Sequence, residues 1–151
     1  MEQLLTMADD AVEKEDYEEA KKALGSALII DKNHSDALQK MGYISMKVED
    51  YSEAKESFEK LLGLDAEDDI AHASLANTLH KLGDESKAVI HHEKAIKIDP
   101  EYAPHHFNYA NTLYDLDRKK EALIEYQKAY ELDNSITIAK EMVDKLEKQN
   151  D

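Results

Sequence analysis

The stretch Ala-Val-Ile-His-His-Glu-Lys-Ala-Ile-Lys-Ile-Asp-Pro, from Ala88 to Pro100, contains the pattern that decides the fold. Its two alanines and its closing Ile-Asp pair recur along the whole chain. A repeat of this kind predicts stacked supersecondary units. Five sets of positions keep a spacing of 34 residues through four periods. They are Ala20, Ala54, Ala88 and Ala122; Ala8, Gly42, Ala76 and Ala110; Ala27, Leu61, Ala95 and Ala129; Ile30, Leu64, Ile98 and Leu132; and Asp31, Asp65, Asp99 and Asp133.

Each period contains the signals of two amphipathic helices. Leu4, Ala8 and Ala11 recur at helical spacing and give the start of unit one an apolar face. The segment from Asp16 to Glu19 then places an aspartate at an expected helix start with a glutamate three residues later, which is the capping-box pattern. The segment from Asp50 to Glu53 repeats this pattern. The sequence therefore predicts a helical hairpin in each unit.

Small residues on both helices predict that the helix axes approach closely. We expect Ala8 to face Ala20, and Ala76 to face Ala88. One hairpin cannot bury both of its faces, so the units are expected to stack on their neighbours. The segment from about 136 to 149 has one apolar and one charged face, which is typical of a terminal cap.

The repeated residues resemble the tetratricopeptide repeat (TPR) family over essentially the whole chain. The resemblance implies an all-α fold, namely a right-handed α-solenoid of four TPR helix-turn-helix repeats plus a C-terminal capping helix. The chain departs from the family pattern where His72 and His106 replace a large apolar residue, and where the glycine between the helices occurs only as Gly83. The implied organisation is a single domain over residues 1–151, with repeats at about 1–34, 35–68, 69–102 and 103–136 and a capping helix at about 136–149.

The charge of the chain limits its partners. It has 19 basic and 34 acidic residues and a net charge of −15. Nucleic acids and anionic membranes bind clustered lysine and arginine, so we expect neither as a partner. The sequence contains no cysteine, no amino-terminal secretory signal and no apolar stretch near the ~20 residues of a membrane span. The expectation is therefore a soluble, cytoplasmic protein.

No motif in the sequence indicates catalysis. The chain lacks a glycine-rich phosphate loop and a nucleophile elbow. Its many carboxylates fall mainly at expected exposed helix positions, where solvated acids make poor general acids. We therefore expect no enzymatic activity and no cofactor.

The resemblance implies a concave groove, lined by the first helix of each hairpin, that binds a protein or peptide partner. The expected function is that of an interaction scaffold or adaptor. Asn77 and Asn111 occupy equivalent places, and an amide can both donate to and accept from a peptide backbone. The same asparagines can instead serve helix geometry alone. The candidate groove residues are Asp9, Tyr43, Lys47, Asn77, His80, Lys81, Phe107, Asn108, Asn111 and Tyr114.

Two other functions stay open. One is self-assembly, because the N-terminal end of the array lacks a polar cap and can leave Leu4 and Leu5 exposed. We expect a monomer or a weak homodimer. The other is the co-chaperone type of TPR domain, whose basic clamp grips a terminal carboxylate. We disfavour it because the clamp positions fall on Leu5 and Asp9 in one register and on Gln39 and Tyr43 in the other, so the cations are missing.

Besides His34 and His80, five histidines gather in units three and four, and two interpretations of them remain. They can form a metal site or a pH switch, because imidazole ligates zinc and titrates near neutrality. In that case His92 and His106 would lie close across a repeat interface. They can instead fill core positions, and without an HExxH or Cys–His pattern we predict no metal site. The histidines are His72, His91, His92, His105 and His106.

Overall fold

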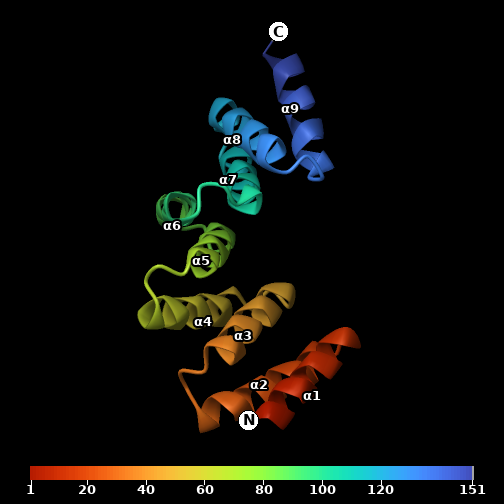
Figure 1. The fold of residues 1–151 in the computed structure, drawn as a ribbon, viewed down its shortest axis with the longest axis vertical. Coiled ribbons are helices and arrows are strands. Elements are labelled where there is room, and N and C mark those ends of the chain that lie inside the picture. The colour runs from red at the N-terminus through yellow and green to blue at the C-terminus, as the bar shows by residue number, and fades with distance from the viewer. Residues whose placement is uncertain (151) are drawn as a thin grey trace.

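The computed structural model describes residues 1–150, which form nine α-helices and no β-strand. This architecture, shown in Figure 1, confirms the predicted all-α solenoid with a final single helix. Within this part of the chain, no helix has the length and apolar character needed to cross a membrane. The helices are α1 (Glu2–Glu13), α2 (Tyr17–Ile30), α3 (Ser35–Lys47), α4 (Tyr51–Leu64), α5 (Asp69–Lys81), α6 (Glu85–Ile98), α7 (Ala103–Asp115), α8 (Lys119–Leu132) and α9 (Thr137–Gln149).

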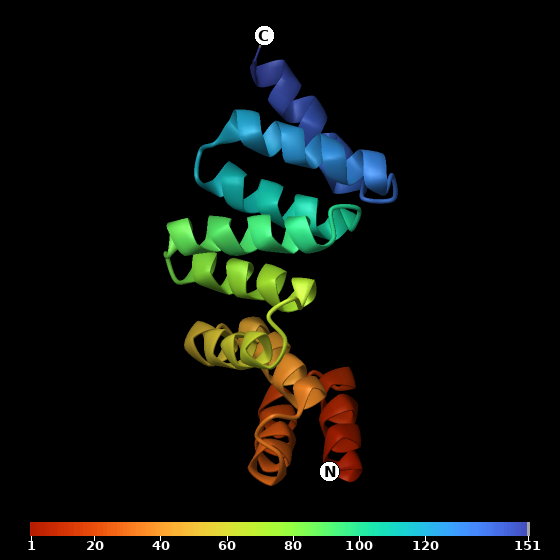
Figure 2. The same ribbon diagram turned by 60° about the vertical axis from the view of Figure 1, so that its left-hand side comes forward.

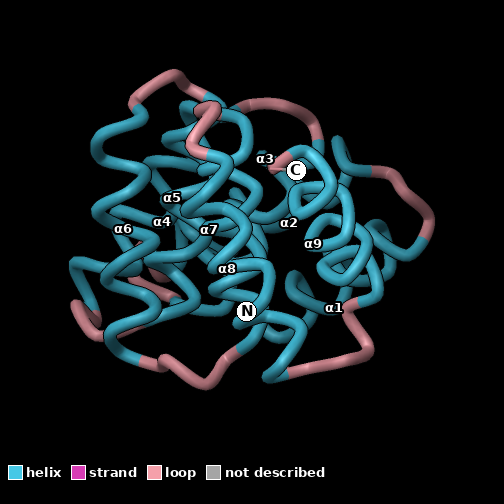
Figure 3. The backbone as a smooth tube through the Cα atoms, turned by 90° about the horizontal axis from the view of Figure 1, so that it is seen from above, coloured by secondary structure: helices cyan, strands magenta, loops and turns pink. Residues whose placement is uncertain are grey.

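The helices stack along one axis. Each odd-numbered helix from α1 to α7 packs most extensively on the even-numbered helix that follows it, and successive hairpins contact each other in chain order. The two termini lie at opposite ends of the molecule (Figure 1). Figure 2 shows α5 to α8 as successive layers, with the first hairpin turned away from them. In the view along the axis, the loops lie at the periphery (Figure 3).

Small residues allow the two helices of each hairpin to approach closely. The members of the expected pairs are at most 1% exposed, and they are Ala8, Ala20, Ala76 and Ala88. In unit two the small residue is Gly42, and the ring of Phe58 fills the space that a side chain at Gly42 would take. The hairpin packing therefore requires a small residue on the first helix.

Each hairpin turns through one residue with a positive φ. The φ angle is 57° at Glu15, 62° at Glu49, 83° at Gly83 and 59° at Asp117, and these positions repeat every 34 residues. The left-handed region favours glycine because a side chain is strained there. Units one, two and four therefore keep the backbone conformation of the turn without its preferred residue.

Aspartates begin most of the second helices. The carboxylates of Asp16, Asp50 and Asp84 accept hydrogen bonds from backbone N–H groups three residues later, at 3.1, 3.3 and 3.4 Å. This is the N-cap that the sequence predicted at Asp16 and Asp50, and Asp84 forms it as well. The N–H of Asp16 donates to the carbonyl of Ala11, and not to a glutamate as in a full capping box. In unit four Arg118 stands at the cap position, and its guanidinium binds a carboxylate in the same turn.

An aspartate also ends the second helix of each hairpin. Asp31, Asp65, Asp99 and Asp133 are the C-cap residues, and each carboxylate accepts a hydrogen bond from the N–H two residues later, at 3.0 to 3.3 Å. Such a bond forms an Asx turn, which directs the chain out of one helix and toward the next. The repeated aspartate thus has a local structural role.

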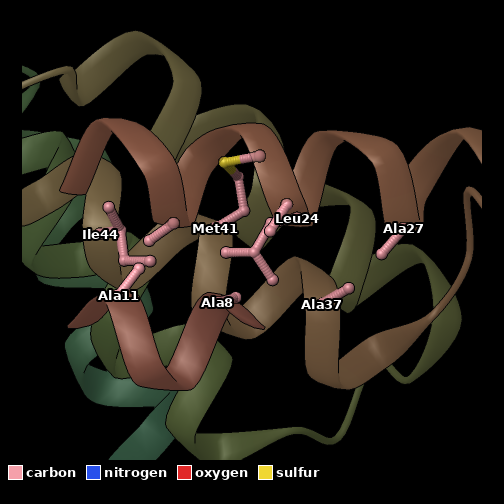
Figure 4. Packing of buried hydrophobic residues seen from close by; sticks show 9 residues of the cluster. Ala8, Ala11, Leu24, Ala27, Ala37, Met41 and Ile44 are labelled. Carbon is pink, nitrogen blue, oxygen red and sulfur yellow. The ribbon is translucent and has the colours of Figure 1, made fainter. Parts of the chain in front are cut away.

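Three apolar clusters follow one another along the solenoid. Figure 4 shows Leu24 and Met41 pointing into the first cluster, together with alanines of the first three helices. Leu4, at the N-terminal end, is half-buried against this cluster. The second cluster surrounds Phe58, and the third includes Leu146, which α9 contributes to the last hairpin. The apolar face of the capping helix is therefore packed on the solenoid.

Candidate functional site

The first helices of units one to three line a surface furrow with two hollows. The first hollow has a volume of about 300 Å³ and lies between α1 and α3. The second has a volume of about 290 Å³ and lies between α3 and α5. Gln39 and Tyr43 line both, so the hollows adjoin. The first is lined by Asp9, Val12, Asp36, Gln39, Lys40, Tyr43 and Ile44, and the second by Gln39, Tyr43, Met46, Phe58, Ile70, Ser74 and Asn77.

The first hollow combines apolar walls with a charged rim. The Nζ atom of Lys40 lies 2.6 Å from an oxygen of Asp9 and 3.3 Å from an oxygen of Asp36. Partial burial of Lys40 opposes its charge, but its hydrogen bonds to the two aspartates dominate and raise its pKa. The Asp9 and Asp36 side chains remain 55% and 49% exposed. Their carboxylates are therefore open to further donors.

Tyr43 forms the ridge between the two hollows. It is 53% exposed. The Nζ atom of Lys47 lies 5.4 Å from the centroid of its ring, which is a cation–π contact. These two predicted groove residues are therefore neighbours, and the rest of the Tyr43 side chain is open to a partner.

The second hollow is mainly apolar. Met46, Phe58 and Ile70 line it together with uncharged polar groups, among them the half-buried amide of Asn77. Phe58 was not among the predicted groove residues because it lies on a second helix, α4. Its ring lies against Gly42, which has no side chain to block it. The signal for Phe58 in the sequence was Gly42, the one glycine among the equivalent positions Ala8, Gly42, Ala76 and Ala110.

The predicted residues of α7 lie outside these two hollows. The carbonyl oxygen of the Asn111 side chain accepts a hydrogen bond of 2.6 Å from the Tyr126 hydroxyl. Phe107 packs edge-on against Tyr126, with ring centroids 5.9 Å apart, and Asn108 is half-buried. The two equivalent asparagines therefore differ, because the side-chain oxygen of Asn111 is already bonded within the protein.

The C-terminal part of the predicted groove also contains bonds between units. The Nε2 atom of His80 lies 2.9 Å from a carboxylate oxygen of Asp115. The ammonium of Lys145 donates to the Tyr114 hydroxyl at 3.0 Å and lies 5.2 Å from the ring centroid. Lys81 is exposed at the end of α5. These contacts join α5 to α7, and α7 to the capping helix.

Two equivalent histidines tie the start of a repeat to its second helix. The Nε2 atoms of His72 and His106 lie 2.9 and 2.7 Å from the backbone carbonyl six residues earlier. Their Nδ1 atoms lie 2.9 Å from Nδ1 of His91 and 2.6 Å from a carboxylate oxygen of Glu125. A carbonyl only accepts, so Nε2 carries a proton in both rings. Both histidines thus make structural contacts where a leucine stands in unit two.

The other histidines are also bonded within the protein. His92 is buried, its Nε2 lies 2.9 Å from the Thr112 hydroxyl, and its ring stacks on Tyr109. His105 Nε2 lies 2.6 Å from a carboxylate oxygen of Asp69. Residues 1–150 contain no group of three or more His, Cys, Asp or Glu side chains that could hold a metal ion. These contacts support the core interpretation of the cluster.

The fold and the furrow define a helical repeat protein. The sequence profile of the tetratricopeptide repeat family matches residues 35–68, 71–102 and 105–136. These segments cover more than half of the chain, and the chain therefore belongs to the tetratricopeptide repeat family. TPR proteins are generally protein-interaction scaffolds, and the fold is typically a non-enzymatic module.

Solved structures share this fold at low sequence identity. MamA is 20% identical, with a TM-score of 0.84 over 95% of this chain and 84% of the other. YrrB, described as a TPR protein with an unusual peptide-binding site, is 23% identical, with a TM-score of 0.77 over 87% and 68%. TTC0263, a thermophilic TPR protein of Thermus thermophilus, is 17% identical, with a TM-score of 0.81 over 96% and 80%. No curated protein matches the sequence.

Proposed function

We propose that this protein is a scaffold that binds an extended segment of a partner protein along the furrow. The observation that carries the proposal is the pair of adjoining hollows on the first helices, with the half-exposed ring of Tyr43 between them. The general role of the TPR family supports it, as does the peptide-binding site named for YrrB, which has the same fold.

The furrow offers both backbone and side-chain recognition. The amides of Gln39 and Asn77 border the second hollow and can donate to, and accept from, the backbone of a bound segment. The two hollows then take two side chains of that segment, since pockets give specificity where backbone bonds give affinity. Tyr43 supplies a rigid aromatic surface at the centre.

The predicted groove residues have graded roles in this proposal. Asp9, Tyr43 and Asn77 line the hollows and contact the segment directly. Lys47 follows Tyr43 by four residues on α3, and His80 and Lys81 follow Asn77 by three and four residues on α5, so helical spacing puts them on the same sides of these helices. A longer segment continues toward the residues of α7, which are Phe107, Asn108, Asn111 and Tyr114.

Selection from a random peptide display library, followed by fluorescence anisotropy, tests the proposal. Tyr43→Ala should lower the affinity for the selected peptides about tenfold, which is typical when a central aromatic side chain of an interface is truncated. Ser74→Arg should block the second hollow. The control is Ile90→Ala on α6, because Ile90 is 48% exposed and lines neither hollow. Selected peptides that bind both furrow variants as well as wild type would place the binding site elsewhere.

A second candidate function, self-association, is favoured by one feature. Ile29 and Ile30 at the end of α2 are 86% and 64% exposed. Large exposed apolar side chains that gather at one end of a helix can mark an interaction surface. Light scattering over a hundredfold concentration range distinguishes the candidates. A constant monomer mass supports a monomeric adaptor, whereas a rising mass that Ile29→Glu abolishes supports a weak homodimer.

A further inference from the structure

We propose that the furrow selects a segment with a basic side chain for the first hollow and an apolar side chain for the second, about three residues apart. The inference rests on the proposed function of the furrow and names the chemistry of its ligand. It commits to one occupant of the first hollow, the ammonium or guanidinium group of a lysine or arginine.

The charges of the first hollow favour a cation. Two carboxylates, Asp9 and Asp36, share the single ammonium of Lys40, so the rim carries a net charge of −1. Each carboxylate has about four acceptor positions, and both side chains are about half exposed. A ligand cation therefore finds free acceptors, whereas a ligand carboxylate meets a net negative charge. The net charge of −15 on the whole chain acts in the same direction.

The walls of the first hollow fit the rest of a basic side chain. Val12 and Ile44 provide apolar surface for its methylene groups. The Tyr43 ring adds flat apolar surface, and because the ammonium of Lys47 already lies 5.4 Å from its centroid, the free acceptors for a ligand cation are the carboxylates of Asp9 and Asp36. A long side chain with a charged end thus meets a matching surface along its length.

The second hollow excludes charge. Its lining contains no charged residue, and Met46, Phe58 and Ile70 form most of its apolar surface. Moving an unpaired charge into such a place costs free energy, whereas an apolar side chain gains it. Met46 can also adjust to side chains of different shape.

The spacing follows from the geometry of stacked helices. The hollows lie one repeat apart, and packed helices are separated by roughly 8–10 Å. An extended chain advances about 3.3 Å per residue, so about three residues connect the hollows. In a polyproline II segment every third side chain points to the same side, which suits this spacing.

A peptide array on the full-length chain tests the spacing. Each peptide carries one arginine and one leucine in a serine–glycine background, separated by one to five positions and in both chain orders. We expect the strongest binding at a separation of about three positions. A maximum at one or five positions would overturn the spacing.

Two variants of the first hollow and one control variant outside it test the charge. Asp9→Asn/Asp36→Asn changes the net charge of the rim from −1 to +1, because Lys40 remains, and Lys40→Gln changes it from −1 to −2. The comparison uses the best arginine peptide of the array and a matched peptide with glutamate in place of the arginine. The double variant should bind the arginine peptide about tenfold more weakly and should prefer the glutamate peptide, whereas Lys40→Gln should bind the arginine peptide more strongly. Asp10→Asn is the control, since Asp10 is exposed on α1 and lines neither hollow. Far-UV circular dichroism checks that each variant is folded.

The outcomes separate this inference from the proposed function. Reversal of the charge preference in the double variant supports both. If Ser74→Arg blocks the peptides but arginine and glutamate peptides bind equally in every variant, the furrow binds peptides and the charge inference is wrong. If no peptide of the library or the array binds, both proposals are overturned.

Discussion

Phe58 packs on Gly42 so closely that a Cβ at Gly42 would lie 2.6 Å from the Cε1 and Cζ atoms of the ring. The ring comes from the second helix of unit two, yet it lines the second hollow between the first helices. The absence of a side chain at position 42 thus connects the packing of the hairpin to the shape of the furrow.

Gly42→Ala should destabilise the protein by about 1–3 kcal/mol, the usual cost of overpacking, because the Phe58 ring is only 3% exposed and has little room to move. Urea unfolding measures the change. Gly25→Ala is the matched control, since Gly25 is also helical but has no atom within 4 Å of the new Cβ. That variant should be stabilised by about 0.5–1 kcal/mol through helix propensity. A Gly42→Ala protein as stable as wild type would contradict the packing described.

Removing a glycine from one hairpin turn and introducing a glycine into another should have opposite effects on stability. Gly83→Ala places a side chain at a φ of 83° and should lower the free energy of unfolding by about 1 kcal/mol. Glu49→Gly removes a side chain at a φ of 62° and should raise it by a few tenths of a kcal/mol or more, because relief of strain exceeds the lost chain stiffness. Thermal denaturation of both variants checks the signs. If both variants change the denaturation temperature in the same direction, backbone strain is not the cause.

The two equivalent asparagines should differ in their effect on stability. Asn111→Ala leaves the Tyr126 hydroxyl without its 2.6 Å acceptor in a largely buried place, and should cost about 1–3 kcal/mol. Burial also raises the pKa of Tyr126 to about 12, so its hydroxyl remains a donor at neutral pH. Asn77→Ala removes no such bond and should change stability by less than about 0.5 kcal/mol while weakening peptide binding. Equal destabilisation by both would show that Asn77 has the same structural role.

Stability should depend on pH through two histidines. Burial lowers the pKa of His91 to about 4, assisted by the charge of His72, and burial lowers the pKa of His92 to about 3. Both values lie below the ordinary 6.5, so the unfolded chain binds protons first as the pH falls. The contribution of each histidine is complete above about pH 6.5 and is lost as the pH decreases, toward 4 for His91 and toward 3 for His92. Urea unfolding at pH 7 and pH 4.5 measures the loss.

His91→Gln tests the origin of this dependence. Glutamine does not titrate, so the variant should lose about 1 kcal/mol less than wild type between the two pH values, after allowance for partial solvent exposure. Asp50 does not interfere, because the hydrogen bond from the N–H of Glu53 keeps its pKa below 3.8. An identical loss in the variant and in wild type would exclude His91 as a source.

Much of the fold follows from local chemistry that the sequence displays. Asp16 and Asp50 were recognisable as helix starts because N-capping depends on residues a few positions apart. The Asx turns of the closing aspartates and the burial of Ala20 are equally local consequences of the repeat. The positive φ angles were not predictable at Glu15 and Asp117, because the residue type disfavours them and only the hairpin geometry imposes them.

The candidate site was less predictable, because it depends on contacts between distant residues. Asn77 and Asn111 look alike in sequence, and only the hydroxyl of Tyr126 distinguishes them. At the position of unit three that is equivalent to Tyr126 stands His92, which bonds Thr112 and not Asn77. Asp9 was among the expected groove residues, whereas the charge balance of the first hollow depends on Lys40, which reaches Asp9 across 31 positions.

The four left-handed turns and the four Asx turns make the joints of the solenoid nearly identical. A whole unit of 34 residues can therefore be gained or lost by gene duplication or deletion while the joints on either side remain the same. Loss of a single residue inside a helix would instead rotate the later residues of that helix by about 100° about its axis and move its apolar face out of the core. Changes of length that keep the joints intact are thus whole units, and the side chains on the first helix of an added unit decide whether the furrow gains a hollow.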